Sequence, residues 1–268
     1  MLYPLTNDYV FKSVFSHKEI QEDFLNSFIE FYDKLNINAD IKSINAEKLL
    51  MAPHISIKEF YGDLIIVLDN NILVSLEMYN GFEEKDLKKS LCYVARIYGN
   101  QLKKGEEYSS VRKVIGITLF KDETYKMNSM LEDYELVDKV NKIKIEEGVE
   151  LILVDIDNEK TILYNEDMKF IKYLKIFRSV NYIEMNKHSG GDEMLEKTIA
   201  YAKEFTSDPD NQNLIDHFES AVRNAKRIAE SKGKTEIAKK MLKDGLSVEI
   251  VNKYTGLNFE ELGNLVVN

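Results

Sequence analysis

The pattern of apolar and polar positions predicts two helices at the start of the chain. Apolar residues recur at helical spacing over residues 7–16 and again over 18–35. Asn7 or Thr6 can cap the first helix, because short polar side chains accept hydrogen bonds from the backbone N–H groups of a first helical turn. Both segments have one apolar face, so we expect each helix to pack against a core.

The pattern then changes to that of strands. A strand is predicted over 41–50, and a hairpin is predicted over 63–68 and 72–79. A helix over 86–104 is expected next, with an apolar stripe that includes Leu91. The remaining elements of this part are strands over 111–120 and 148–156 and helices from about residue 165.

This order of elements predicts a mixed α/β fold whose core runs α-β-β-β-α-β. The segment HSGGD at 188–192 has the composition of a linker and precedes a remainder that is helical throughout. We therefore expect one domain over residues 1–187 and a helical C-terminal segment over 188–268. Short helices are predicted in that segment over 236–243, 246–254 and 259–266.

Composition narrows the class of protein. No apolar run approaches the roughly 18 residues of a membrane span, and the single cysteine, Cys92, excludes an internal disulfide. These features favour a location in the reducing cytoplasm, away from any membrane. The net charge of −10 argues against a protein whose whole surface binds nucleic acid.

Positive charge is concentrated in one stretch, residues 223–243. It holds eight Lys or Arg against two Glu and so carries +6, which leaves −16 for the rest of the chain. A polyanion such as DNA would therefore have to be bound by a local patch. A solvated basic helix and a contact between two copies in a homodimer are the other interpretations of this stretch.

Two acids in the predicted hairpin are candidates for chemistry. A two-residue loop would pair Leu64 with Glu77 and place Asp63 and Glu77 on opposite faces of the sheet. A three-residue loop would pair Asp63 with Glu77 on one face, and Asn71 is a residue that tolerates the left-handed conformation such a loop needs.

Two facing carboxylates would repel each other in a largely apolar sheet. A divalent cation would remove that repulsion, and Mg²⁺ commonly binds through one or two carboxylates while it polarises a phosphate. In the alternative interpretation, Asp63 begins its strand, Glu77 lies near the end of its own, and water solvates each acid separately.

Four segments together point to a family. They are NDYVFKSVF, the hairpin with GD followed by LEMY, SLCYVARIYGNQLKKGEEYSSVRKVIGITLF, and EIAKKMLKDGLSVEIVNKYTGL. In this order they resemble the recombination-promoting nuclease and transposase family of PD-(D/E)XK-type nucleases. The resemblance implies a restriction-endonuclease-like core, a small helical tail, and DNA cleavage that depends on Mg²⁺, with Mn²⁺ as the alternative ion. It also implies that Asp63 and Glu77 bind the metal.

The chain departs from the family at the third catalytic position. The family has Glu-x-Gln there, and PD-(D/E)XK enzymes generally have Lys, whereas this chain has Tyr79. A phenol with an ordinary pKa near ~10 is a weak base and carries no positive charge. Lys88 and Lys89 also stand where family members tend to have Arg, and Lys lacks the bidentate fork of a guanidinium.

The sequence supports two hypotheses. The first is a metal-dependent DNA endonuclease of recombination or mobile-element type. The second is a nuclease scaffold whose chemistry is weakened or lost and which acts as a DNA- or protein-binding module. For the nuclease, the expected catalytic residues are Asp63, Glu77 and Tyr79, and the expected phosphate contacts are Lys88, Lys89, Arg96 and Lys12, although Lys12 could instead form an i,i+4 pair with Asp8.

Overall fold

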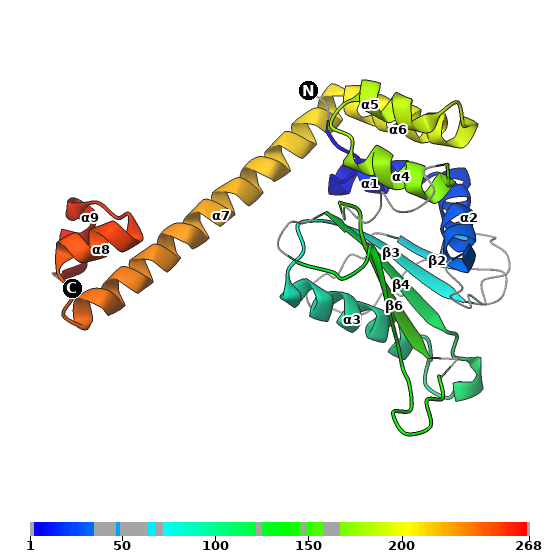
Figure 1. Cartoon of the computed structure of the whole chain (residues 1–268), viewed down its shortest axis with the longest axis horizontal. Coiled ribbons are helices and arrows are strands. Elements are labelled where there is room, and N and C mark those ends of the chain that lie inside the picture. Colours follow the sequence, from blue (N-terminus) through cyan, green and yellow to red (C-terminus); the bar gives the residue numbers. More distant parts are fainter. Residues whose placement is uncertain are drawn as a thin grey trace. The chain divides into compact units, whose positions relative to one another are not determined.

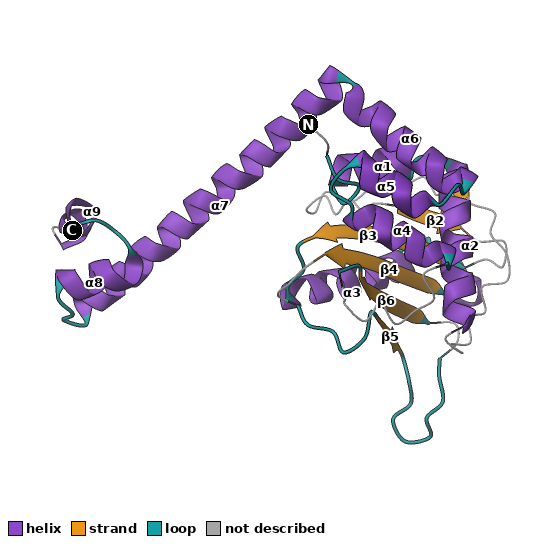
Figure 2. Cartoon of the chain, turned by 45° about the horizontal axis from the view of Figure 1, so that its top comes forward, coloured by secondary structure: helices purple, strands orange, loops and turns teal. Residues whose placement is uncertain are grey.

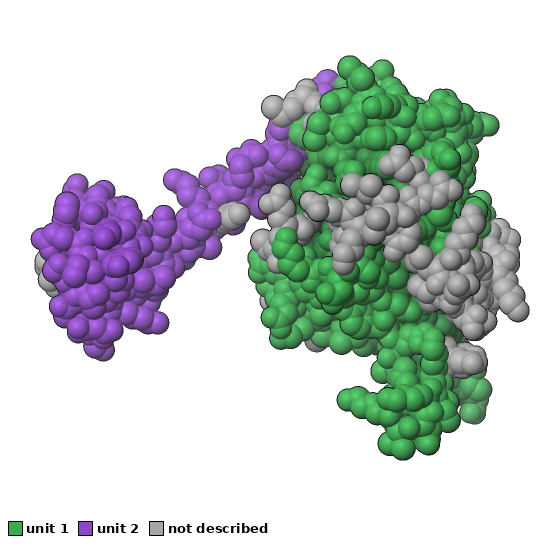
Figure 3. All heavy atoms as spheres, viewed as in Figure 1, with its two compact units in different colours: residues 1–207 green, residues 208–268 purple. Residues whose placement is uncertain are grey.

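The computed structural model describes residues 3–34, 47–48, 64–67, 72–121, 125–145, 148–157 and 167–266. It confirms the mixed α/β class: one sheet is combined with helices on both of its faces (Figures 1 and 2). The chain divides into two compact units, Met1–Ser207 and Asp208–Asn268 (Figure 3).

The division falls later than the expected boundary at residue 188. The HSGGD segment instead forms the turn between α5 (Tyr182–Ser189) and α6 (Glu193–Ser207), and Gly190 ends α5 in the left-handed conformation with φ of 61°. The glycines therefore end a helix, but α5 and α6 pack against each other within the first unit.

The sheet of the described residues has the strand order β1-β2-β3-β4-β6-β5. Its centre is parallel, because β3 pairs with β4 and β4 pairs with β6 in that sense. The pairs β1–β2, β2–β3 and β5–β6 are antiparallel. The strands are β1 (Glu47–Lys48), β2 (Leu64–Val67), β3 (Leu73–Asn80), β4 (Val114–Lys121), β5 (Leu131–Glu135) and β6 (Val149–Asp155).

Strand β5 was missed by the sequence analysis. Its sequence, LEDYE, is mostly polar, and it lies at the edge of the sheet, where Leu131 is the one buried residue of the strand. An edge strand of this kind lacks the apolar alternation that identifies a strand in sequence. Of the strand expected over 41–50, only β1 falls within the described residues.

One face of the sheet is covered by three helices, α1 (Asp8–Val14), α2 (Lys18–Lys34) and α4 (Lys169–Arg178) (Figure 1). Asn7 caps α1 as expected, since its side chain accepts a hydrogen bond from the backbone N–H of Tyr9. The helices meet in an aromatic core, and α5 and α6 pack on them from outside. The aromatic residues of this core include Phe11, Phe15, Phe24, Phe28, Phe31, Phe170, Tyr173 and Phe177.

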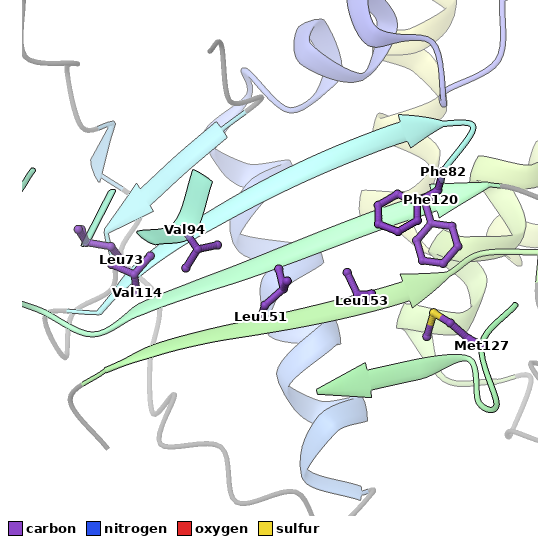
Figure 4. Close-up of a cluster of buried hydrophobic side chains, with 8 residues drawn as sticks. All are labelled: Leu73, Phe82, Val94, Val114, Phe120, Met127, Leu151 and Leu153. Atoms are coloured by element: carbon purple, nitrogen blue, oxygen red, sulfur yellow. The ribbon is translucent and has the colours of Figure 1, made fainter. Parts of the chain in front are cut away.

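The other face is covered by α3 (Glu84–Gly99), which packs on β4 and β6. The 3-10 turn η1 (Tyr108–Ser110) then leads into β4. The expected stripe of α3 is wrong at Leu91, which is 50% exposed, and the helix ends five residues before 104. The core on this face consists of Leu73, Phe82, Val94, Val114, Phe120, Met127, Leu151 and Leu153 (Figure 4).

The second unit consists of the 35-residue helix α7 (Pro209–Lys243) followed by α8 (Val248–Thr255) and α9 (Phe259–Val266). A small core of Ala238, Val251, Leu257 and Leu262 joins the end of α7 to the two short helices. Gly256 ends α8 in the left-handed conformation, with φ of 69°, as glycine commonly does after the last turn of a helix. None of the helices in the described part of the chain meets the length and apolarity required to span a membrane.

Candidate active site

Glu77 lies on β3 and faces α3. Side chains alternate along a strand, so Glu77 shares its face with Leu73, which belongs to the core under α3. Its carboxylate is almost fully enclosed, with 7% of the residue exposed. An acid buried in this way needs hydrogen bonds or a counter-charge to remain ionised.

The register of β2 on β3 is that of the three-residue loop. Leu64 lies opposite Leu76, and Val67 lies opposite Leu73. The two-residue loop would have placed Leu64 opposite Glu77, so that alternative is wrong. Asp63 itself lies outside the described residues.

Tyr79 holds Glu77 from the same strand. Its hydroxyl donates a hydrogen bond of 2.9 Å to Oε2 of Glu77. Burial, and next the negative charge of Glu77, raise the pKa of Tyr79 well above its ordinary value of 10. The phenol therefore remains protonated at neutral pH, and it acts as a donor to the carboxylate rather than as a base.

Further buried polar groups lie on the α3 face of the sheet around Glu77. Thr118 of β4 is the register partner of Glu77, and Ser75 precedes Glu77 by two positions on β3. Ser90 points inward from α3, and each of these three residues is 2% exposed. Polar side chains are unusual in the core of a sheet, so their grouping at one place marks this region as a functional-site candidate.

The two neighbouring lysines of α3 point in different directions. Nζ of Lys88 lies 4.0 Å from a carboxylate oxygen of Glu84, with 77% of the lysine side chain exposed. Nζ of Lys89 instead lies 4.7 Å from the centroid of the Tyr79 ring. Arg96 is exposed in the last turn of the same helix.

Lys12 lies on α1, away from α3. Its ammonium pairs with the carboxylate of Asp8 one turn earlier, at 2.8 Å. This is the i,i+4 pair that the sequence analysis gave as the alternative role of the two residues. A role of Lys12 in DNA binding stays a prediction.

A second group of acids was missed by the sequence analysis. Asp133 and Glu135 of β5 and Glu150 of β6 each offer a carboxylate oxygen, and these oxygens lie within 4.8 Å of one another, so the group could hold a metal ion. Glu150 follows Val149 and faces α2, on the side of the sheet opposite to Glu77. The group depends on the pairing of Glu135 with Glu150, which could not be predicted while β5 itself was not recognised.

Positive charges already balance part of this acidic group. Nζ of Lys113 lies 2.7 Å from Glu150, and Nζ of Lys144 lies 2.7 Å from Glu135. The hydroxyl of Tyr32 on α2 donates to Asp133 at 2.7 Å. Burial raises the pKa of Asp133 to about 6, despite this hydrogen bond. A cation would have to compete with two ammonium groups, so we regard the group mainly as a polar link between α2, β5 and β6.

The chain resembles known proteins at the level of a family. No curated protein and no solved structure shows significant similarity to it. A family model described as PD-(D/E)XK nuclease family transposase matches residues 5–232, which include every strand of the sheet and all of α3. The match covers most of the chain, and the mixed α/β fold agrees with it. The chain therefore belongs to the family of PD-(D/E)XK nuclease family transposases.

Proposed function

We propose that the protein is a metal-dependent DNA endonuclease of recombination or mobile-element type. The observation that carries this proposal is the buried carboxylate of Glu77 on a strand of a PD-(D/E)XK family sheet. The register of β2 supports Asp63 as its partner, because the pair after Leu64 and Leu76 would be Asp63 and Glu77. The two acids would then share the face that is covered by α3.

The donor set suits the expected ion. Carboxylate oxygens are hard ligands that Mg²⁺ and Mn²⁺ accept, and Asp63 and Glu77 would supply them. Bound there, the ion would polarise the phosphate and lower the pKa of a water molecule. Tyr79 keeps the Glu77 carboxylate oriented through its donated hydrogen bond. The preference for Mg²⁺ over Mn²⁺ stays a prediction.

The proposed reaction is hydrolysis of a phosphodiester. Water attacks phosphorus, and the bond from phosphorus to one bridging oxygen breaks. The attacking water gives a proton to solvent and the leaving oxygen takes one, so the products are a phosphate monoester and a hydroxyl group. Side-chain cations would hold the neighbouring DNA phosphates by charge-assisted contacts. These cations are Lys88, Lys89 and Arg96, which are exposed on α3, and the half-buried Lys12 on α1.

A plasmid-nicking assay tests this proposal. Wild-type protein should nick supercoiled plasmid with Mg²⁺ or Mn²⁺ and lose the activity in EDTA. Glu77→Gln and Asp63→Asn should each reduce the nicking rate by at least about 10²-fold, because each removes a charged oxygen ligand. Glu204→Gln, at an exposed position on α6, is the matched control and should nick at the wild-type rate. Nicking that persists in EDTA would contradict the proposal.

A second candidate function rests on Tyr79. A neutral phenol fills the position of the family's amide or cation, so the scaffold could bind DNA or a protein partner without cutting. Failure of the wild-type protein to nick under any divalent metal, together with measurable DNA binding, would favour this function. The cytoplasmic location and the homodimer stay predictions.

A further inference from the structure

Tyr79 connects a strand acid to a helix cation. Its hydroxyl donates to Glu77 at 2.9 Å, while Nζ of Lys89 lies 4.7 Å from the centre of its ring. A cation within about 6 Å of an aromatic ring centroid is attracted by the electron-rich face of the ring. The ring of Tyr79 thus holds the ammonium of Lys89 beside the position that a lysine from β3 would occupy.

This placement is specific to Lys89 among the lysines near it on α3. Lys85 pairs with Glu83 at 2.8 Å, and Lys88 is directed at Glu84. Within the part of the chain that the structure describes, Lys89 forms no ion pair, and its cation–π contact with Tyr79 is the interaction that orients it. Its charge is therefore available to a phosphate.

Phosphodiester hydrolysis needs a positive charge at this place. Negative charge develops on the phosphate oxygens as water attacks, and a preorganised cation stabilises that charge in the transition state. A phenol carries no positive charge in either protonation state, so Tyr79 at the third catalytic position cannot provide it. Lys89 is exposed, so DNA can approach its ammonium.

We propose that Lys89 is the catalytic cation of the site: it reaches from α3 over the ring of Tyr79 and contacts the scissile phosphate in place of a lysine at position 79. The assignment rests on the proposed nuclease function. It gives Tyr79 a constructive role, because the residue that departs from the family pattern orients both the metal-binding acid and the cation. The positive charge that acts on the phosphate is thus supplied by α3, the helix that covers this face of the sheet, and not by β3.

The first test compares lysine variants of the full chain. Lys89→Ala should lower the rate of Mg²⁺-dependent plasmid nicking at saturating protein by about 10²–10³-fold. Lys85→Ala removes the same charge one turn earlier on α3 and should nick at the wild-type rate. DNA affinity, measured by fluorescence anisotropy in EDTA, should change by the same small factor in both variants. Both positions are exposed, and thermal melting should verify that both variants are folded.

The second test places a positive charge on strand β3 in a variant that lacks the charge of Lys89. The double variant Tyr79→Lys with Lys89→Ala should nick plasmid at least tenfold faster than Lys89→Ala alone. Tyr79→Gln with Lys89→Ala supplies a neutral side chain at the same position and should recover less. The stability of both double variants should be compared by urea unfolding, since Tyr79 is half-buried and packs against the core under α3.

The possible results separate the two proposals. A wild-type protein that never nicks removes the nuclease function and the Lys89 assignment together. A wild-type protein that nicks, with Lys89→Ala within threefold of its rate, overturns the assignment and leaves the nuclease function intact. An affinity loss in Lys89→Ala as large as its rate loss also overturns it, because Lys89 would then only anchor DNA. Loss of rate at constant affinity, with recovery by Tyr79→Lys, establishes it.

Discussion

At the residue scale, the environment of each ionisable group decides what that group can do. Glu77 and Asp133 are both carboxylates in the sheet of the first unit, and each accepts a hydrogen bond from a tyrosine. They lie on opposite faces, so the proposed metal site and the acidic link to α2 are physically separate. Each tyrosine can therefore be tested without disturbing the other group.

Removal of the Tyr79 hydroxyl should destabilise the protein. Tyr79→Phe keeps the ring but deprives the buried Glu77 carboxylate of a donor, which should lower the free energy of unfolding by about 1–3 kcal/mol in the absence of metal. Urea unfolding measures this change. Tyr108→Phe is the matched control, because Tyr108 is 87% exposed and its hydroxyl can bond to water. Equal stability of the two variants would contradict a stabilising hydrogen bond at Glu77.

Asp133 should make stability depend on pH. Its pKa is about 6 in the folded protein against 3.8 for an ordinary Asp, so the folded state binds the proton more tightly. The wild-type free energy of unfolding should therefore fall as pH rises from about 4 to 6. Asp133→Asn keeps an acceptor for Tyr32 but removes this titration. The free energy of unfolding of this variant, relative to that of wild type, should increase by about 1 kcal/mol between pH 4 and pH 7. This figure is reduced because solvent screens the partly exposed carboxyl.

Asp138 provides the control for this experiment. A backbone hydrogen bond from Val140 lowers the pKa of this exposed carboxyl. Its titration therefore lies at and below the ordinary Asp value of 3.8, so Asp138→Asn should keep a nearly constant stability relative to wild type between pH 4 and pH 7. Urea unfolding at several pH values measures both variants, and an equally flat profile for Asp133→Asn would show that Asp133 does not have a raised pKa.

At the element scale, the position of α3 is fixed by a close approach to the sheet. Gly116 of β4 leaves room for Val94 of α3, and a Cβ atom at Gly116 would overlap with Cγ2 of Val94. Strand β4, which carries Gly116, pairs in parallel with β3, which carries Glu77. Val94 lies on α3, the helix that also carries Lys89. The distance between the strand acid and the helix cation therefore depends on this packing.

Gly116→Ala should push α3 away from the sheet. The expected loss in the free energy of unfolding is about 1–3 kcal/mol, the usual cost of overpacking a core, because the branched Val94 side chain has little freedom to move aside. Adding Val94→Ala removes the clashing methyl group. The double variant should be more stable than the sum of the two single losses predicts, as measured in a double-mutant cycle. Strict additivity would show that the two residues do not meet.

At the scale of the whole molecule, charge is segregated along the second unit. The first part of α7 carries acids such as Asp210 and Asp216, while residues 223–243 carry +6 from eight basic and two acidic residues. The lysines in this stretch with described side chains are exposed. The structure thus presents the predicted basic stretch as an accessible helix surface.

Neutralising that surface should weaken DNA binding and its dependence on salt. A full-length variant with five Lys→Gln changes should show a smaller slope of log affinity against log salt, by about 0.9 for each phosphate that the protein no longer neutralises. Anisotropy titrations at several salt concentrations measure the slope. Lys187→Gln with Lys203→Gln, on α5 and α6, is the control. An unchanged slope would mean that residues 223–243 do not bind DNA, and it would favour their interpretation as a solvated helix or a contact in a homodimer. The five lysines are Lys232, Lys234, Lys239, Lys240 and Lys243.

Much of the fold could be predicted because local pattern and burial agree. Helices α1 and α2 and strands β3, β4 and β6 overlap the segments predicted from apolar periodicity. Strand β5 could not be recognised, because an edge strand with polar side chains has no distinctive period. The end of α3 and the exposure of Leu91 were misjudged for a related reason, since several apolar stripes fit an amphipathic sequence.

The sequence by itself determined the mixed α/β class, the family and the residue types available for chemistry, because these follow from short-range pattern and composition. Tertiary structure decided the relations between segments. It selected the register that leaves Leu64 opposite Leu76, it placed Lys89 rather than Lys88 over Tyr79, and it gathered Asp133 and Glu150 on one face. Such relations depend on how strands pair and how a helix packs, and those long-range interactions leave no periodic trace in a single sequence.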